Sequence, residues 1–518
     1  MQITKKMTET SLLLSAYKHQ QNGQWTDAIS LYKDVLKTQP HNLQALFGIA
    51  EIAQKLNQND TALSLFSQII SFDPHYLKAY QCRGHLLRML GNPEGAIADF
   101  SAAIALDGAA ADIFNSRGIA HCQMLNFDEA IADFSQAINR NKNFADAFYN
   151  RALVYRKIND FAHSIDDYTS TIGLKPNHFQ AYNNRGIAYR EAGQIDKASA
   201  DFLKSSEINP DFHDGYWNAS LCLLMGGDYE KGWPLYEHRW SSAGFTSRRR
   251  NFSAPLWLGK DTLEGKTILL HSEQGLGDSL QFCRYVPLVD NLGCHIILEV
   301  EKPLMNIMRS LSNSIEIIEK NTALPHFDYH CPLMSLPLAF KTTLKTIPHE
   351  TPYLRVNKDR VAWWRTKLGP KKRPRIGLVW RGNPNHPNDQ KRSIRLRDII
   401  HKLPDDLDWI SLHKDIFDDE EKLINASKKI THFGEIIGDF AEIGALCEAL
   451  DAILCVDTSI AHLGGALGLP VHVLLPYVPD FRWLSGRADS PWYPSLRLYR
   501  QGPERSWAEP MQNVTLPI

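Results

Sequence analysis

Several features are scarce in this sequence, and each scarcity argues against a class of protein. The eight cysteines are widely spaced and form no C-x-x-C pair, so neither a disulfide framework nor a zinc site is expected and a reducing cytoplasm fits best. Apolar runs are too short to cross a bilayer, which takes about 18 residues, and the first residues lack the apolar stretch of a signal peptide. We therefore do not expect an integral membrane protein.

An excess of charge is also lacking. The net charge of −1 results from 57 basic and 58 acidic side chains, so nothing indicates a nucleic-acid or anionic-membrane partner. The contents of 43% apolar and 22% charged residues are those of a soluble globular protein. With 518 residues the chain is too long for one core, and roughly two to four domains are expected.

A period of 34 residues runs through the first half of the chain. Three sets of positions recur with it, and each set keeps one kind of side chain. The first set is small: Ala28, Ala62, Ala96, Ala130, Ser164 and Ala198. The second is also small: Ala16, Ala50, Gly84, Gly118, Ala152, Gly186 and Ser220. The third is aromatic: Tyr32, Phe66, Phe100, Phe134, Tyr168, Phe202 and Tyr236.

This pattern predicts two amphipathic helices in each period. Small residues let the two helices approach closely, and the aromatic residue wedges between that pair and the next. Prolines at Pro40, Pro74, Pro176 and Pro210 fall in phase where the second helix must end. One unit cannot bury its apolar face alone, so the units stack into a superhelix.

The pattern resembles the tetratricopeptide repeat (TPR) family, with seven units over residues 9–245. The resemblance implies an α-solenoid whose groove binds a protein or peptide. The seventh unit departs from the pattern at Gly232 and adds Trp233 and Trp240, so we expect a degenerate junction unit packed on the second half of the chain.

One groove position carries asparagine in three units: Asn150, Asn184 and Asn218. An asparagine there can hydrogen-bond an extended peptide backbone without selecting its sequence. This resembles the asparagine ladder of the TPR-bearing O-linked N-acetylglucosamine transferases. The alternative is a tolerated polar residue on a solvated face, since the first three units carry Leu14, Gly48 and Cys82 instead.

The second half changes period and alternates apolar runs of strand length with helix-like segments. Such continuous runs predict parallel sheets covered on both faces. Two blocks, 255–355 and 371–500, predict a pair of Rossmann-like lobes with a cleft between them. Ligands of such sheets lie beyond the carboxyl ends of the strands, so the residues just after each strand are the candidates.

The first candidate is the turn in "ILLHSEQGLGDSLQF", residues 268–282. Gly275 and Gly277 resemble a phosphate-binding loop, but Leu280 stands where a dinucleotide fingerprint needs its third glycine, and no Gly-Lys-Ser/Thr is present after them. Two interpretations of Asp278 remain. It caps the helix that begins there, or the glycines present it to a ligand.

The second candidate is "AILCVDTSIAHLGGALGLPVHVLLP". A strand over 452–456 ends at Asp457, Thr458 and Ser459, and the next helix carries His462 in its first turn. Hydroxyls and free N–H groups at a helix start bind phosphate well. The alternative is a plain capping sequence beside a buried histidine.

The third candidate is the polar loop after the strand at 376–380. Arg381, Lys391 and Arg392 are cations suited to a nucleotide diphosphate, or they are ordinary charges of a surface loop.

Together, the G-L-G-D turn, the V-D-T-S-x-A-H-L-x-x-A-L-G-x-P segment and the basic loop resemble family 9 glycosyltransferases, the heptosyltransferase-like group of GT-B fold. The resemblance covers about 255–500, and the first lobe is short for that family. It implies that Asp278 is the general base and that Asp457, Thr458, Ser459 and His462 lie at the nucleotide-sugar site. It also implies that Lys391, or else Arg392 or Arg381, contacts the diphosphate.

We therefore expect an inverting, metal-independent glycosyltransferase that moves a sugar from a nucleotide-sugar to an acceptor, a protein by preference, recruited by the TPR groove. No cofactor or metal is expected, and the sequence has no His/Cys ligand cluster. One alternative is a non-catalytic TPR interaction scaffold with a degenerate GT-B platform. Another is transfer to a glycan or lipid.

Overall fold

The computed structural model describes residues 8–107 and 110–516. The chain divides into two compact units: the first ends at Ala188 and the second begins at Tyr189, inside helix α11 (Phe179–Glu191). Within the described residues, no helix combines the length and the apolar character needed to cross a membrane.

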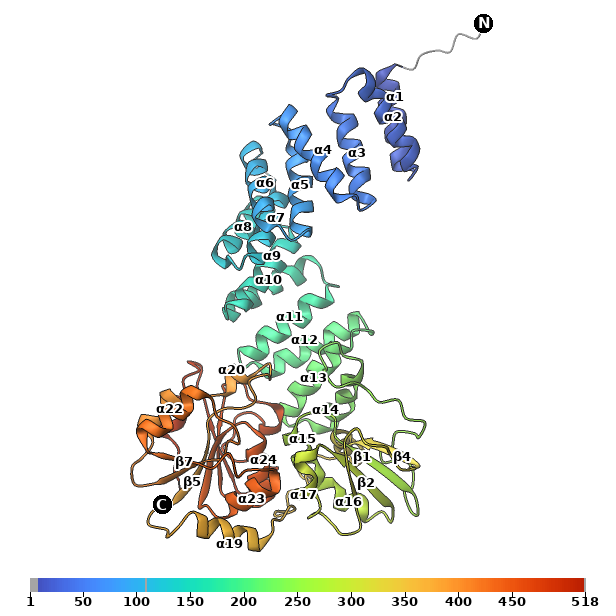
Figure 1. Cartoon of the computed structure of the whole chain (residues 1–518). Helices are drawn as coiled ribbons and strands as arrows, with labels where there is room; N and C mark the ends of the chain where they lie inside the picture. The colour runs from blue at the N-terminus through green and yellow to red at the C-terminus, as the bar shows by residue number, and fades with distance from the viewer. Residues whose placement is uncertain (1–7, 108–109, 517–518) are drawn as a thin grey trace. The chain divides into compact units, whose positions relative to one another are not determined.

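The first unit is built from helix pairs, in which the first helix of each pair packs on the second (Figure 1). Its helices are α1 (Glu9–Gln21), α2 (Trp25–Thr38), α3 (Leu43–Lys55), α4 (Asn59–Phe72), α5 (Leu77–Met89), α6 (Pro93–Leu106), α7 (Ala111–Gln123), α8 (Phe127–Arg140), α9 (Ala145–Lys157) and α10 (Phe161–Leu174), with most of α11 after them. Pro40, Pro74 and Pro176 each lie two residues beyond the end of a second helix, as the repeat pattern predicted.

Close packing explains the small residues of the repeat. The residues of the first small series, from Ala28 to Ala198, are fully buried. A Cβ atom on Gly84 would lie 2.9 Å from the Phe100 ring, and one on Gly118 would lie 2.8 Å from the Phe134 ring. The aromatic side chain of each second helix thus occupies the space that a larger residue on the first helix would need.

An arginine ladder adds polar links between neighbouring pairs. Arg151 on α9 donates two hydrogen bonds to Asp167 on α10, at 2.7 and 2.8 Å, and a third of 2.8 Å to Ser135 on α8. Arg117 and Arg83 repeat this arrangement one and two periods earlier. Each arginine therefore ties both helices of its own pair to the pair before it.

The second unit begins with helices that share a core with the rest of the unit. After the end of α11 come α12 (Ile195–Ile208), α13 (His213–Gly226), α14 (Tyr229–Tyr236) and a short 3-10 helix η1 (Glu237–Ser241). Trp233 and Tyr236 are 2% and 1% exposed, and they belong to the same buried apolar cluster as the α/β part of the unit. The last helix pair is thus built into the core of the second unit.

The first lobe of the α/β part contains a parallel sheet of order β3-β2-β1-β4. Its strands are β1 (Thr267–His271), β2 (His295–Val300), β3 (Glu316–Glu319) and β4 (Tyr329–Pro332). Between and after them lie α15 (Leu276–Phe282), α16 (Val286–Asp290), α17 (Met305–Met308) and α18 (Leu336–Ala339). Leu256 bridges to His330 and adds the connector to the β4 edge.

The second lobe contains a parallel sheet of order β10-β9-β8-β5-β6-β7. Its strands are β5 (Arg375–Val379), β6 (Asp408–Ser411), β7 (Ile430–His432), β8 (Ala452–Val456), β9 (Val471–Leu475) and β10 (Leu496–Arg500). Its helices are α19 (Lys358–Lys367), α20 (Asp389–Arg392), α21 (Leu396–Ile399), α22 (Asp418–Ser427), α23 (Phe440–Glu448), α24 (Ser459–Ala466) and α25 (Ala508–Gln512).

The prediction of α/β structure with parallel sheets in the second half is confirmed. In chain order the second sheet has the doubly wound order 3-2-1-4-5-6, and the first has its initial part, 3-2-1-4. The strand order reverses between β5 and β8 in the second lobe and between β1 and β4 in the first. These two points are where a ligand crevice is expected.

Candidate functional site

The candidate site lies where the two lobes meet, at the carboxyl ends of β1 and β8. Helix α15 starts in the turn after β1, helix α24 starts directly after β8, and the two helices pack together (Figure 1). A Cβ atom on Gly277 would lie 2.9 Å from Cδ2 of His462 and 3.4 Å from Cα of Ser459. Two motifs almost 200 residues apart in sequence are therefore in direct contact.

This contact explains the glycine at 277. Any side chain at this position would collide with the His462 ring. Gly275 lies just before the first residue of α15, and its N–H donates a 2.7 Å hydrogen bond to Oδ2 of Asp278. Asp278 thus caps the first turn of α15 with one carboxylate oxygen.

The other carboxylate oxygen of Asp278 is bound by an arginine from the second lobe. Oδ1 accepts a hydrogen bond from Nη2 of Arg482, and the two side chains form an ion pair. Burial raises the pKa of Asp278 above its usual range, while the Arg482 guanidinium acts in the opposite direction. Both oxygens of the proposed base are therefore engaged.

Sequence reasoning missed Arg482, although the rule on strand ends could have found it. Arg482 and Asp480 lie in the loop after β9, and Arg482 Nη1 donates a 2.6 Å hydrogen bond to Oδ1 of Asp480. Only 7% of Arg482 is exposed, and its Nε atom is buried without a hydrogen-bond partner among the described residues. One guanidinium therefore serves carboxylates of both lobes and keeps one donor unused.

Asp457, Thr458 and Ser459 form the turn between β8 and α24, as predicted. Burial, and secondarily the charge of Asp480, raise the pKa of Asp457 to about 6, while Arg392 opposes that change. Thr458 precedes the first helical residue, and its Oγ1 is buried without a hydrogen-bond partner in the part of the chain that the structure describes. An unused hydroxyl at a helix start is what an anion site requires.

His462 is a buried neutral side chain. Its ring stacks on Trp483 with centroids 5.0 Å apart, and Nδ1 lies 3.0 Å from the hydroxyl of Tyr493. Burial, reinforced by Arg482, holds the pKa of His462 well below its usual range. Its place between Gly277 and Trp483 makes it part of the contact between the lobes.

The three basic candidates after β5 have different surroundings. Arg381 donates hydrogen bonds of 2.9 and 3.0 Å to the carboxylate of Glu420, which occupies its guanidinium within the second lobe. Lys391 pairs with Glu191 at the end of α11, at 2.8 Å. Arg392 is the candidate whose charge lowers the pKa of both Asp457 and His462, so of the three it is the one with an electrostatic effect on the turn after β8.

The helices before the lobes support the turn after β1. Arg239 on η1 is completely buried and donates hydrogen bonds of 3.1 and 3.0 Å to the two carboxylate oxygens of Glu273. Gln274 Nε2 donates a 2.8 Å hydrogen bond to the hydroxyl of Tyr236. Burial raises the pKa of Glu273 to about 7, against the effect of Arg239.

A cavity of about 550 Å³ opens between the lobes close to other strand ends. Lys302 lies after β2, Lys414 after β6, and Ile436 and Gly438 after β7. Asn306 of the first lobe closes one side by donating a 2.6 Å hydrogen bond to Asp439 of the second. Its volume suits a small molecule, and its charged lining is mixed, with Lys302 and Lys414 on one hand and Asp439 and Glu442 on the other.

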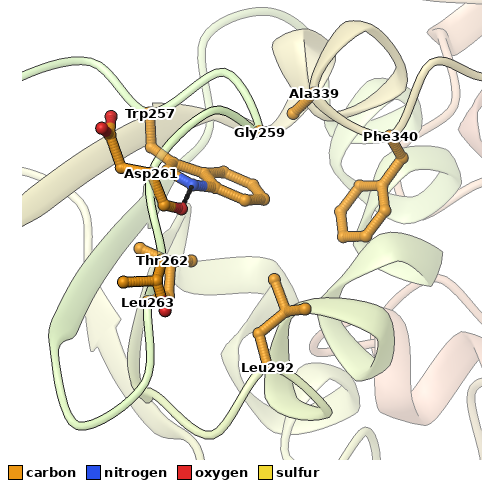
Figure 2. A pocket seen from close by; sticks show the side chains of 8 residues that line it. All are labelled: Trp257, Gly259, Asp261, Thr262, Leu263, Leu292, Ala339 and Phe340. Carbon is orange, nitrogen blue, oxygen red and sulfur yellow. Dashed lines mark hydrogen bonds between the residues drawn. The ribbon is translucent and has the colours of Figure 1, made fainter.

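A second cavity, of about 260 Å³, lies in the first lobe alone (Figure 2). Trp257, Leu263, Leu292 and Phe340 surround it, and the indole N–H of Trp257 donates a 2.9 Å hydrogen bond to the carbonyl of Asp261. Leu263 and Leu292 precede β1 and β2, so this cavity lies near the amino ends of the strands. It is therefore separate from the site at the carboxyl ends.

The asparagines predicted for the TPR groove make side-chain contacts along the repeats. Asn150 Nδ2 donates a 3.0 Å hydrogen bond to Asn115, and Asn184 Nδ2 donates one of 2.8 Å to the hydroxyl of Tyr149. Both are half-buried, as is Asn218 of α13. Each of the two bonds links the first helix of one repeat to the first helix of the repeat before it: α9 to α7 and α11 to α9. The asparagine positions therefore lie one after another along the array.

Family models of the tetratricopeptide repeat match residues 19–81, 116–179 and 179–212. The chain carries a TPR array. The predicted repeat period is thereby confirmed, and it agrees with the helix pairs of the structure. TPR arrays present extended concave surfaces that bind other proteins, so protein interaction is the function that the repeats support.

Protein FlbA of Caulobacter vibrioides is 26% identical over 321 residues, which cover 56% of this chain and 52% of FlbA. The chain thus spans about half the length of that curated relative. Among solved structures, MamA is 26% identical and covers 32% of this chain and 92% of its own, with a TM-score of 0.31. The C-terminal part of a TPR protein from Cytophaga hutchinsonii is 17% identical, covers 44% of this chain and 93% of its own, and has a TM-score of 0.40.

Within the described residues no group of three or more His, Cys, Asp or Glu side chains is arranged to hold a metal ion. The site offers instead the half-buried carboxylate of Asp278, two arginines, and the amide groups and hydroxyl at the start of α24. Such a set can accept a proton at one point and stabilise an anion at another.

Proposed function

We propose that the second unit is an inverting glycosyltransferase of GT-B type that takes its sugar from a nucleotide-sugar and modifies an acceptor brought by the TPR array. One observation carries this proposal. Helix α15, with Asp278 in its first turn, packs on the start of helix α24, with Thr458 and Ser459. A carboxylate and an anion-binding helix start therefore meet at the reversal points of two doubly wound sheets.

The reaction assigns one role to each part of the site. Asp278 accepts the proton of the acceptor hydroxyl, whose oxygen forms a bond to the anomeric carbon. The bond from that carbon to the phosphate oxygen breaks, and its electron pair leaves with the nucleoside diphosphate. Arg392, Arg482 and the N–H groups at the start of α24 stabilise the charge of the leaving group.

The nucleoside part of the donor would extend along the carboxyl ends of the strands of the second lobe. The 550 Å³ cavity, with Lys302 and Lys414, lies along that edge and has room for it. A protein acceptor is favoured over a glycan or lipid because the repeats supply a protein-binding surface.

The match to FlbA, which covers 56% of this chain, is longer than the repeat region and so includes part of the α/β half.

The test is a transfer assay on the full chain with a panel of nucleotide-sugars, and then mass spectrometry of co-expressed proteins for an added sugar. Asp278→Asn is expected to lower the transfer rate at least a hundredfold, since general-base catalysis contributes about that factor or more. Asp489→Asn is the matched control, because Asp489 is also paired with an arginine but lies on the surface. Equal rates in the wild type and in Asp278→Asn would remove the base assignment.

The second candidate is a non-catalytic TPR scaffold, and two observations favour it. The first sheet has four strands against six in the second, and both oxygens of Asp278 are engaged. Calorimetry with the nucleotide-sugar panel separates the candidates, because a scaffold with a degenerate platform is expected to bind none of them.

A further inference from the structure

The Arg482 guanidinium bridges the two lobes at the point where the proposed base lies. It binds Asp278 of the first lobe through Nη2 and Asp480 of the second lobe through Nη1. It also packs on Phe481 and reaches Sδ of Met334, at 3.9 Å, in the loop after β4. A side chain with these contacts couples the state of one lobe to that of the other.

In this arrangement the ion pair with Arg482 lowers the basicity of Asp278. An acceptor hydroxyl needs a carboxylate oxygen within hydrogen-bond reach, and each oxygen already accepts one bond, from the Gly275 N–H or from Arg482. The bond to Gly275 is part of helix α15 itself and can persist during a reaction. The bond to Arg482 crosses between the lobes, and opening it would raise the basicity of Asp278.

Anion-binding groups lie beside this pair. Nε of Arg482 and Oγ1 of Thr458 are buried without a hydrogen-bond partner in the described chain, and Nε of Arg392 makes no hydrogen bond there either, although it pairs with Asp389 at 3.5 Å. The charges of Arg392 and Arg482 both lower the pKa of Asp457, just before α24, so both guanidiniums lie near that turn. A diphosphate there would attract the same guanidinium that Asp278 now holds.

We infer that the Asp278–Arg482 ion pair is a latch that a diphosphate opens: the anion draws Arg482 to itself and thereby frees the Asp278 carboxylate for the acceptor. The inference rests on the proposed function, because it concerns the same base and the same donor. It adds that donor binding precedes activation of the base. Arg482 then contacts the leaving group and also positions Asp278.

The test is a calorimetric titration of the full chain with inorganic pyrophosphate at constant pH and ionic strength. If Asp278 and the anion compete for Arg482, Asp278→Asn should bind pyrophosphate more tightly than the wild type, by about fivefold or more, the usual lower range of coupling between sites. Arg482→Gln should bind about tenfold more weakly. In the double variant Arg482→Gln/Asp278→Asn, Asn at position 278 should no longer increase the affinity for pyrophosphate.

A merely structural role for the pair predicts a different result, since both single variants would then bind more weakly than the wild type. That outcome overturns the latch. Equal affinities of Asp278→Asn and the wild type would also overturn it. So would the absence of pyrophosphate binding in the wild type, both single variants and the double variant. Asn at 278 can still accept the Gly275 N–H bond, so this variant should fold even if Arg482→Gln does not; the thermal unfolding midpoint checks both. Asp489→Asn serves as the control and should leave the affinity unchanged.

The outcomes also separate the latch from the proposed function. The titration contains no sugar, so equal pyrophosphate affinities combined with normal sugar transfer would reject the latch and keep the transferase. Tighter binding by Asp278→Asn with undiminished sugar transfer would keep the competition for Arg482 and reject Asp278 as the base.

Discussion

At the scale of single residues, the site is defined by the positions where neighbours leave no space. Gly277 has no side chain because His462 occupies the position where a Cβ atom would lie. Thr458 keeps its hydroxyl free at a helix start within the described chain, and Asp457 is half-buried and feels the charge of another carboxylate, Asp480. Selection for stability alone would give these polar groups hydrogen-bond partners or replace the residues with apolar ones. Their presence therefore indicates a functional role.

Gly277→Ala tests the close approach of the two motifs. Alanine favours a helix over glycine by about 1 kcal/mol, so a free position would become more stable. We expect instead a loss of about 1–3 kcal/mol in the free energy of unfolding, because the methyl group overlaps the His462 ring. The loss should shrink when Gly277→Ala is made in a His462→Ala background, as measured by urea titration. An equal loss in both backgrounds would contradict the contact.

Asp457 makes a prediction about pH. Its pKa of about 6 in the folded chain exceeds the ordinary value of 3.8, so the folded state keeps a proton that the unfolded state has lost between these values. Its contribution to stability is therefore present at low pH and declines as the pH rises from about 4 to 6. Thermal unfolding of Asp457→Asn should show a weaker decline over that window than the wild type. Parallel curves would reject the raised pKa.

At the scale of helices and strands, the repeats owe their register to polar as well as apolar contacts. Small residues and aromatic rings set the distance between helices. Apolar contacts are not directional, however, so they do not fix the register of one helix pair on the next. Each arginine of the ladder joins three helices by bonds of fixed geometry, and its aspartate is buried. The ladder therefore fixes how each pair is placed on the one before it.

Arg151→Met is expected to cost about 3 kcal/mol, because it leaves the buried Asp167 carboxylate without its partner. Adding Asp167→Leu should restore part of that loss, since an apolar pair can replace a buried ion pair. Lys37→Met is the control: its pair with Asp34 is exposed, so the change should stay within about 0.5 kcal/mol. Urea titration monitored by far-UV circular dichroism measures all of them, and a similar small effect for Arg151→Met would contradict the ladder.

The same scale shows how far the sequence predicts the structure. β1, β2, β5, β8 and β9 are continuous apolar runs, and that pattern alone locates them. β4, β7 and β10 are not continuous apolar runs, and all three lie at the edges of the strand orders, where such a run is not needed. In the site, Asp457 and His462 could be found because a motif contains them. The pairing of Arg482 could not, because its partner Asp278 lies 204 residues away and no local pattern links them.

At the scale of the whole molecule, the boundary seen in the sequence and the boundary between compact units differ. The repeat pattern extends to about residue 245, but the second unit already begins at Tyr189. Tyr236 and Arg239 are buried against Gln274 and Glu273, so the last repeat completes the core beneath the turn that carries Asp278.

This arrangement predicts how fragments behave. A chain of residues 179–518, which keeps helices α11–α14, should fold and unfold cooperatively in thermal denaturation. A chain of residues 246–518 should aggregate, because removal of Trp233, Tyr236 and Arg239 exposes the core and leaves Glu273 buried without a counter-ion. A soluble and cooperative 246–518 fragment would show that the last repeat is dispensable.

The position of Tyr189 also bears on how such a protein diversifies. Repeats grow and shrink by whole units of 34 residues. Units can be gained, lost or exchanged upstream of α11 while every residue of the candidate site keeps its neighbours. Partner choice can then evolve by changing the number and surface of helices α1–α10 while the candidate site stays the same, whereas a recombination event near residue 245 would remove the helices that support the turn after β1.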